Sequence, residues 1–226
     1  MSAYRDLVSL ARQAAEGTLA ADPDPRWAVR LDPDKCRNAA VLMLFGALDP
    51  VPAVSTKPLA PAQLDVLLIE RAATLGNHPG QIAFPGGTVD PQDGSAVDAA
   101  LREAVEETGL EADGVEVLGT LPALPLTVSN FMVTPVLAWW ASPSPVSVVD
   151  YAESAQVFRV PVRDLLDPDN RYTATRTRRG QTYRGPAFRV NGVVVWGFTA
   201  ALLDRIFTEL GWAVAWDAQR VIPAPV

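Results

Sequence analysis

Three glutamates in the middle of the chain, Glu103, Glu106 and Glu107, have the types and the spacing of metal ligands. Residues three and four apart share one face of a helix, so a helix here crowds three negative charges within one turn. The neighbouring cation, Arg102, pairs with Glu106 at i+4 but does not neutralise all three charges. Magnesium and manganese prefer carboxylate oxygens, so the spacing predicts a divalent-cation site. A solvated acidic helix face is the alternative that spacing alone leaves open.

The helix itself is predicted from an apolar stripe and two capping signals. Apolar residues repeat at i, i+3, i+4, i+7 and i+8, namely Val97, Ala100, Leu101, Ala104 and Val105. Ser95 with Asp98 three residues later is a weak capping-box signature, and Gly109 suits the left-handed position that ends a helix. Gly86 and Gly87 predict a turn just upstream. We therefore expect the stripe to pack inward and the glutamates to face a cleft.

The segment around the glutamates resembles the Nudix box. Residues 102–110, REAVEETGL, match the REUxEExGU half of the box at every position, and Gly86-Gly87 resembles its glycine start. The usual spacing from Gly87 puts the box arginine at position 101, whereas here it is Arg102. The turn is therefore one residue longer, and the isolated acidic position falls near Asp93 or Gly94. This lengthened turn is similar to that of the coenzyme A pyrophosphatase branch of the Nudix hydrolases.

Other segments resemble the same branch, and together they extend the likeness over roughly residues 37–210. They are LLIER at 67–71, HPGQIAFPGG at 78–87, VTPV at 133–136 and VWGFTA at 195–200. One position departs from the branch: the arginine expected five residues after Arg71 is Gly76 here. This departure bears on substrate affinity and on substrate identity.

The resemblance implies a metal-dependent attack of water on phosphorus. A divalent cation, Mg²⁺ or Mn²⁺, would neutralise the charge on the phosphoryl oxygens and lower the pKa of bound water. In relatives the first and last glutamates of the box helix bind the metal, which implies Glu103 and Glu107 here. Glu106 matches an additional acidic ligand, and Gly86 offers its carbonyl. Arg102 would orient the glutamates through charge-assisted hydrogen bonds.

The general base and the substrate contacts are predicted less directly. Different Nudix members use different carboxylates as the base, and the candidates here are Glu103 and Glu153. Glu153 opens the segment ESAQVFRVP, which resembles the place where relatives carry a distal glutamate ahead of a strand. A solvated loop carboxylate is the alternative for Glu153. Arg71, His78 (the only histidine) and Gly87 are the expected substrate contacts.

The order of elements predicts an α+β fold. Strands are expected at 38–45, 64–71, 81–84, 115–121, 131–140 and 157–160, with a hairpin of 188–190 and 193–196 across Asn191-Gly192. Helices are expected at 3–20, 96–108, 162–166 and 198–210. The resemblance sharpens the fold to the Nudix α/β/α sandwich, with a mixed sheet between helices. A Pro- and Asp-rich linker over 22–34 makes the first helix an appendage, which divides the chain into 1–34 and a Nudix domain at 35–226.

Composition limits the setting in which the protein works. The 226 residues are 49% hydrophobic, enough for the core of one domain. No apolar run reaches the ~18 residues of a membrane span, and a signal peptide's apolar stretch is absent at the N-terminus. A single cysteine, Cys36, predicts a reducing cytoplasm. The net charge of −7 argues against nonspecific binding to nucleic acid or to an anionic membrane. We expect a cytoplasmic monomer or small homo-oligomer.

The leading hypothesis, implied by the resemblance, is hydrolysis of the pyrophosphate bond of coenzyme A or a derivative to 3′,5′-ADP and 4′-phosphopantetheine. A second hypothesis, which Gly76 keeps open, changes the small nucleotide-containing substrate to NADH, ADP-ribose or another nucleoside diphosphate derivative. A third is a Nudix domain that senses a nucleotide for a partner, although all box glutamates are present. Four arginines are either a 3′-phosphate contact or, as we favour, a charged hairpin: Arg176, Arg178, Arg179 and Arg184.

Overall fold

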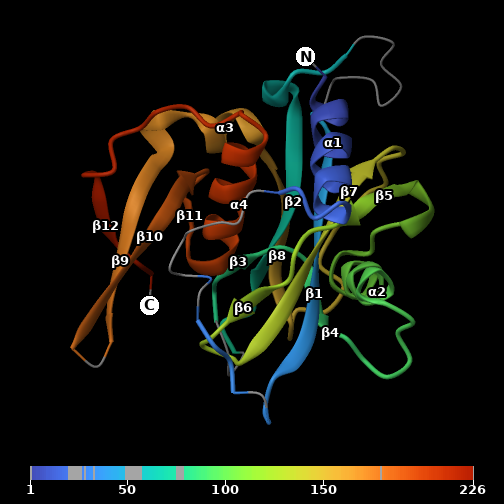
Figure 1. The fold of residues 1–226 in the computed structure, drawn as a ribbon, viewed down its shortest axis with the longest axis horizontal. Coiled ribbons are helices and arrows are strands. Elements are labelled where there is room, and N and C mark those ends of the chain that lie inside the picture. The colour runs from blue at the N-terminus through green and yellow to red at the C-terminus, as the bar shows by residue number, and fades with distance from the viewer. Residues whose placement is uncertain are drawn as a thin grey trace.

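A mixed sheet of eight strands forms the centre of the computed structural model, which describes residues 2–19, 27, 29–32, 34–48, 58–74, 79–178 and 180–225 (Figure 1). Its strands are β1 (Arg37–Ala47), β2 (Leu64–Arg71), β3 (Ile82–Ala83), β4 (Gly86–Thr88), β5 (Val115–Thr120), β6 (Leu124–Leu126), β7 (Phe131–Trp140) and β8 (Ser154–Pro161). The path runs β3-β2-β1-β7-β5, with β4 on β1, β6 on β7 and β8 on β2. Only β1 and β7 pair in parallel in this sheet.

A second sheet lies beside the first and has the order β11-β10-β9-β12. Its strands are β9 (Arg171–Arg178), β10 (Gln181–Val190), β11 (Val193–Val195) and β12 (Val221–Pro223). Asn191 and Gly192 join β10 to β11 with φ of 50° and 83°. Positive φ at both central residues is the geometry that an Asn-Gly hairpin turn favours, so the predicted hairpin is confirmed.

Helices cover both faces of the main sheet. They are α1 (Ala3–Ala15), α2 (Ala96–Thr108), α3 (Val162–Leu166) and α4 (Gly197–Glu209), with 3-10 turns at Pro61–Gln63, Ala112–Gly114 and Pro168–Asn170. Successive residues of β1 point to opposite faces: Leu42 and Leu44 pack with α2, whereas Met43 and Phe45 pack with α1 and α4. Burial on both faces explains the continuous apolar run of β1. The α+β fold with a mixed sheet between helices is confirmed.

Strands β1 and β2 separate along their length, and the short strands β3 and β4 fill the gap. β1 pairs with β2 only at 45–47, whereas β4 pairs with β1 at 39–41 and β3 with the end of β2. Leu42 N–H donates to the carbonyl of Pro85 at 2.8 Å, which holds the β3–β4 connection against β1. The glycine pair 86–87 is therefore a strand and not the turn that we predicted, because its backbone finds partners in β1.

The N-terminal helix α1 packs against β5, and it is shorter than predicted, ending at Ala15. Leu7 and Leu10 are buried in the same hydrophobic cluster as the main sheet, and the Tyr4 hydroxyl donates to Glu116 Oε1 at 2.7 Å. A domain boundary at residue 34 stays a prediction, since much of the 22–34 linker lies outside the described residues. In the described part of the chain, every helix is too short or too polar to span a membrane.

Candidate active site

Helix α2 carries the glutamates and begins and ends as the sequence predicts. Ser95 Oγ accepts from Asp98 N–H at 3.2 Å and donates to Asp98 Oδ2 at 2.9 Å. Gly109 ends the helix in the left-handed conformation, with φ of 68°. Ala100 and Ala104 are fully buried against the sheet, but Val105 is 39% exposed, so its place in the inward stripe was wrong. The helical repeat predicts which face of the helix is apolar, but not which residues at the edge of that face are buried.

The three glutamates lie in different environments along one face. The Glu106 side chain is 56% exposed and that of Glu103 is 19% exposed, whereas Glu107 is only 4% exposed. The prediction that the glutamates face a cleft did not distinguish these unequal exposures. The amide of Gly86 on β4 donates to Glu107 Oε2 at 2.9 Å, which ties the carboxylate to the strand beside the helix. This contact uses the Gly86 N–H; metal binding by the Gly86 carbonyl stays a prediction.

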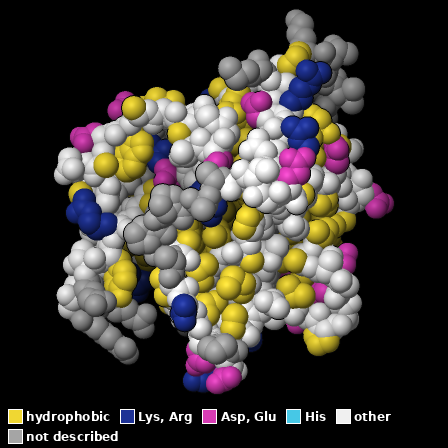
Figure 2. All heavy atoms as spheres, viewed as in Figure 1, with side chains coloured by type: hydrophobic (Ala, Val, Ile, Leu, Met, Phe, Trp, Pro, Cys, Tyr) yellow, Lys and Arg dark blue, Asp and Glu magenta, His cyan; other side chains and the backbone are white. Residues whose placement is uncertain are grey.

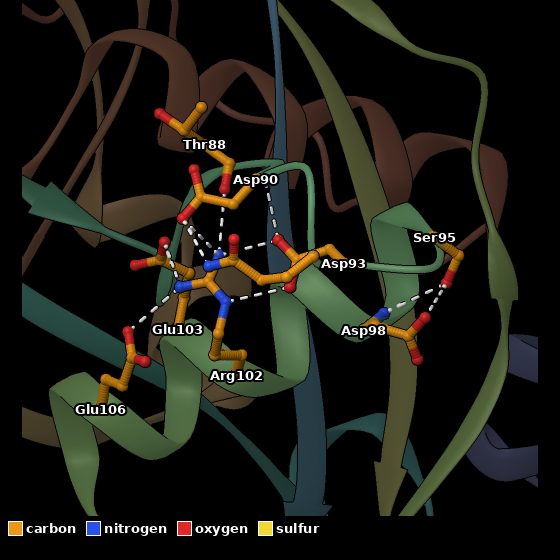
Figure 3. Close-up of polar contacts among 9 residues, drawn as sticks. Thr88, Asp90, Asp93, Ser95, Asp98, Arg102, Glu103 and Glu106 are labelled. Atoms are coloured by element: carbon orange, nitrogen blue, oxygen red, sulfur yellow. Dashed lines mark hydrogen bonds and ion pairs between the residues drawn. The ribbon is translucent and has the colours of Figure 1, made fainter.

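Arg102 lies at the centre of the polar network beside the glutamates (Figure 3). Its Nε and Nη2 donate to both oxygens of Asp93 at 3.0 and 2.9 Å, a bidentate pair. Nη1 donates to Glu103 Oε1 at 2.9 Å and to Glu106 Oε2 at 3.1 Å. The fork of the guanidinium thus fixes two glutamates relative to the connection that precedes the helix. Asp93, not Gly94, is the isolated acidic residue that pairs with this arginine.

The connection between β4 and α2 is itself closed by hydrogen bonds. Asp90 N–H donates to Asp93 Oδ2 at 2.8 Å, and Asp93 N–H donates to the Asp90 carbonyl at 2.9 Å. Arg102 Nη2 also donates to the Thr88 carbonyl at 3.1 Å and lies 3.7 Å from Asp90 Oδ2. The Arg102 hydrogen bonds, followed by that from Asp90, hold the pKa of Asp93 below its ordinary value. We did not predict Asp90 and Thr88; the turn-forming DPQDG segment was the only signal for them.

Gly87 packs directly on Glu103. A Cβ atom at position 87 would lie 2.4 Å from the carboxyl carbon of Glu103 and 2.4 Å from its Oε1. A Cβ on Gly86 would lie 2.3 Å from the carbonyl oxygen of Ala40. The glycines are therefore required for two different close approaches: Gly86 to the β1 backbone and Gly87 to a glutamate. The sequence indicated that glycines belong here, but not what they approach.

Burial makes the carboxylates of Glu103 and Glu107 costly to ionise. Desolvation raises the pKa of Glu107 to about 7, although the Gly86 N–H opposes the shift and the charge of Glu103 adds to it. The pKa of Glu103 is also raised, first by burial, against the lowering effect of Arg102. The charge of Arg71 lowers the pKa of Glu107, and that of Glu153 raises the pKa of both glutamates. Arg71 and Glu153 therefore lie close to the glutamates of α2.

Glu153 and Arg71 meet because β2 and β8 pair up to this point. Arg71 is the last residue of β2 and is opposite Ser154, across an irregularity between Glu70 and Arg71. Ala72 N–H donates to the carbonyl of Glu153 at 2.9 Å, which extends the pairing by one residue. Glu153 is exposed in this turn, and its charge acts on the glutamates of α2, so a role in the site stays a prediction beside the solvated-loop alternative. Its assignment as general base stays a prediction, as does that of Glu103.

The remaining candidates are two residues that the structure does not describe and the arginines of the second sheet. His78 and Gly76 lie outside the described residues. Arg176 and Arg184 lie on the strands β9 and β10 of the second sheet, and the Arg176 guanidinium is over the Trp196 ring at 5.4 Å. Figure 2 shows basic side chains among hydrophobic ones over this sheet. This placement agrees with the charged-hairpin interpretation; Arg179 and the Arg178 side chain lie outside the description.

The donor set fits a hard divalent cation, although the side chains do not converge on one point as they lie. Within the described ranges, no three His, Cys, Asp or Glu side chains are grouped closely enough to hold a metal ion. Arg102 engages Glu103 and Glu106, while the Gly86 amide engages Glu107. Glu107 is buried with a raised pKa, and Arg102 is shared among several carboxylates; a divalent cation would supply further positive charge through oxygen ligands. Each of these contacts uses one oxygen of its carboxylate, which leaves the other oxygen for a cation.

We expect divalent-cation affinity to depend on pH, because the metal must displace a proton from Glu107. In the metal-free fold the raised pKa means that Glu107 is more readily protonated than in the unfolded chain. Protonated Glu107 therefore stabilises the fold fully below pH 4.5, and this stabilisation is lost as the pH rises through about 7. The Mn²⁺ dissociation constant should therefore rise by about tenfold for each pH unit below 7, and it should be nearly constant above pH 7. Titrations followed by electron paramagnetic resonance from pH 5.5 to 8.5 measure this. A constant affinity across that range would contradict the assignment.

Comparison with known proteins identifies the family. The NUDIX domain model matches residues 50–177. The uncharacterized Nudix hydrolase NudL of Cronobacter sakazakii is 38% identical over 146 residues, covering 65% of this chain and 75% of NudL. NudL of Photorhabdus laumondii is 35% identical over 179 residues, covering 78% of this chain and 87% of its own. The crystal structure of RenU, a Nudix hydrolase from M. smegmatis, aligns over 56% of this chain and 71% of its own at 25% identity, with a TM-score of 0.43. With the family match over more than half of its length, this chain belongs to the Nudix hydrolases, pyrophosphohydrolases that act on nucleoside diphosphate derivatives.

Proposed function

We propose that this Nudix hydrolase cleaves the pyrophosphate bond of coenzyme A or a derivative, giving 3′,5′-ADP and 4′-phosphopantetheine or its acyl form, with Mg²⁺ or Mn²⁺. The observation that carries the proposal is the place of the branch-like segments in the fold. LLIER ends β2 at Arg71, and QIAFPGG forms β3 and β4, whose glycines contact the glutamates of α2. The segments that resemble the coenzyme A branch therefore border the acidic helix.

The described residues of the site have positions that support the roles proposed for them, and the role of His78 rests on the sequence resemblance alone. Glu103, Glu106 and Glu107 would hold the cation, which neutralises phosphoryl charge and acidifies bound water. Arg102 fixes the orientation of Glu103 and Glu106 and is itself fixed by Asp93. Arg71, at the end of β2 and close to Glu107, would bind a phosphate oxygen of the substrate. His78 and Gly87 complete the proposed substrate contacts.

Glu153 is the carboxylate that we propose as general base. A general base must accept a proton from the attacking water at the face of the phosphate opposite its leaving group. Glu153 lies in the turn just before β8, on a different element from α2, and its charge raises the pKa of Glu103 and Glu107. Glu103, in contrast, already accepts a hydrogen bond from Arg102, which favours its ionised form as a metal ligand. With Glu103 as a metal ligand, Glu153 is the carboxylate that accepts the proton in this proposal.

Coenzyme A is expected to be hydrolysed with a kcat/KM at least about tenfold above that of NADH or ADP-ribose, a difference of about 1.4 kcal/mol in transition-state stabilisation. The measurement is kcat/KM for all three substrates with Mg²⁺ and with Mn²⁺, with products identified by mass. A tenfold preference for NADH or ADP-ribose would overturn the coenzyme A assignment and leave the Nudix chemistry intact. Tight binding of a nucleotide with no hydrolysis would favour a sensing domain.

A further inference from the structure

The position of Glu153 depends on its backbone, because its carboxylate has no hydrogen bond or ion pair with other residues in the described part of the chain. The loop that joins β7 to β8 passes the end of α2, where Ser147 N–H donates to the Thr108 carbonyl at 2.9 Å. It ends at β2, where the Glu153 carbonyl accepts from Ala72 N–H. The direction in which Glu153 points is therefore set by the turn that leads into the strand.

Asp150 closes that turn with three hydrogen bonds. Its Oδ1 accepts from Ala152 N–H at 2.7 Å. Its carbonyl accepts from Glu153 N–H at 3.1 Å and from Ser154 N–H at 3.0 Å. The carbonyl bonds belong to the backbone and survive any substitution, but the side-chain bond belongs to the aspartate alone. Without it the Tyr151–Ala152 peptide, which leads into Glu153, loses its hydrogen bond to the aspartate, and the turn is held by the two carbonyl bonds alone.

We infer that Asp150 is a positioning residue for catalysis, whose side chain closes the turn that leads into Glu153 and thereby sets the direction of the Glu153 carboxylate. The inference rests on the proposed role of Glu153 as base. Asp150 is exposed and lies outside the hydrophobic clusters, so its side chain is not needed for the core. A small shift of a catalytic group lowers turnover strongly, so loss of the turn should lower kcat while substrate binding is kept.

Three substitutions of Asp150 distinguish the effect of its hydrogen bond in the turn from the effect of its negative charge. Asp150→Asn keeps an oxygen acceptor at the same place without the charge, whereas Asp150→Glu keeps the charge but moves the acceptor one methylene away; Asp150→Ala removes both. We expect Asn to stay within threefold of wild-type kcat. Glu and Ala should lower kcat by about tenfold, with KM changed by less than twofold. The reverse order, with Glu active and Asn impaired, would mean that charge matters and would overturn the inference.

The chain offers a matched control at Asp217, an exposed aspartate with the same turn. Its Oδ1 accepts from Gln219 N–H at 2.9 Å, and its carbonyl accepts from Arg220 N–H at 3.1 Å, before β12 in the second sheet. Asp217→Ala removes the same kind of bond away from α2 and should leave kcat within twofold. A loss equal to that of Asp150→Ala would show a general effect on the fold and would overturn the inference.

The decisive measurement is a double-mutant cycle with Glu153→Gln, using whichever pyrophosphate substrate the wild type hydrolyses fastest. If Asp150 acts through Glu153, Asp150→Ala should cost about tenfold in the wild-type background and less than twofold in Glu153→Gln. Equal losses in both backgrounds would overturn the inference. Unchanged kcat in Glu153→Gln alone would remove the base assignment and the Asp150 role together. A wrong choice of coenzyme A as substrate would leave this cycle interpretable.

Discussion

Glu107→Gln should lower pyrophosphate hydrolysis by at least about a hundredfold at saturating Mg²⁺, the loss that follows removal of one main electrostatic element. Glutamine keeps the shape of the side chain and an oxygen that can accept from the Gly86 amide. It removes only the negative charge that a buried cation would need beside it. Steady-state kcat with Mg²⁺ measures the loss, and thermal melting checks that the fold is kept.

The melting temperature of Glu107→Gln gives a second test of this prediction, independent of turnover. Because ionised Glu107 is unfavourable in the metal-free fold, Glu107→Gln should melt higher than the wild type at pH 8 without metal. Glu111→Gln is the matched control, since Glu111 is an exposed carboxylate just beyond the same helix. It should change kcat by less than twofold. Unchanged turnover in Glu107→Gln would falsify the metal assignment of the helix.

Features that depend on neighbouring residues were predictable from the sequence. The boundaries of α2 follow from the Ser95 cap and from Gly109, because both act through backbone groups within a few residues. The Arg102–Glu106 contact within α2 follows from i, i+4 spacing. Strand β1 was predictable because burial on both faces leaves an unbroken apolar run. These local signals identify the candidate site and its chemistry.

Features that depend on distant partners were not predictable in the same way. Gly86–Thr88 becomes a strand because β1 supplies its hydrogen-bond partners, and nothing local signals that pairing. Strands β9 and β10 contain several arginines and threonines, and β10 also contains Gly185 and Pro186, so the apolar pattern that predicts a strand is weak. The depth of Glu107 arises because β4 covers it, while its neighbour Glu106 stays in solvent. Spacing placed the glutamates on one face but could not assign their unequal burial.

The same tertiary contacts make Gly87→Ala a test that the sequence alone could not have specified. Alanine is compatible with the backbone there, since Gly87 is not among the residues with positive φ. Its Cβ would lie 2.4 Å from the Glu103 carboxyl carbon, so the end of this flexible side chain must move. Displacing a catalytic carboxylate by about 1 Å costs about a hundredfold in rate, and we expect kcat to fall by that factor. The melting temperature should change little, because a side-chain end moves and no backbone does.

Gly86→Ala, one residue earlier, should give the opposite pattern. Its Cβ would meet backbone atoms of β1, the Ala40 carbonyl oxygen at 2.3 Å and the Val41 Cα at 2.7 Å, and neither can move without disturbing the sheet. We expect a loss of about 1–3 kcal/mol in stability, visible in chemical denaturation. If Gly87→Ala keeps wild-type kcat, then Glu103 does not need the position that it holds against β4, and its assignment as a metal ligand loses its structural support. If Gly87→Ala instead unfolds at the temperature of Gly86→Ala, the glycine pair serves the sheet alone. Comparing kcat with melting temperature in the two variants therefore separates the contribution of β4 to the fold from its contribution to the site.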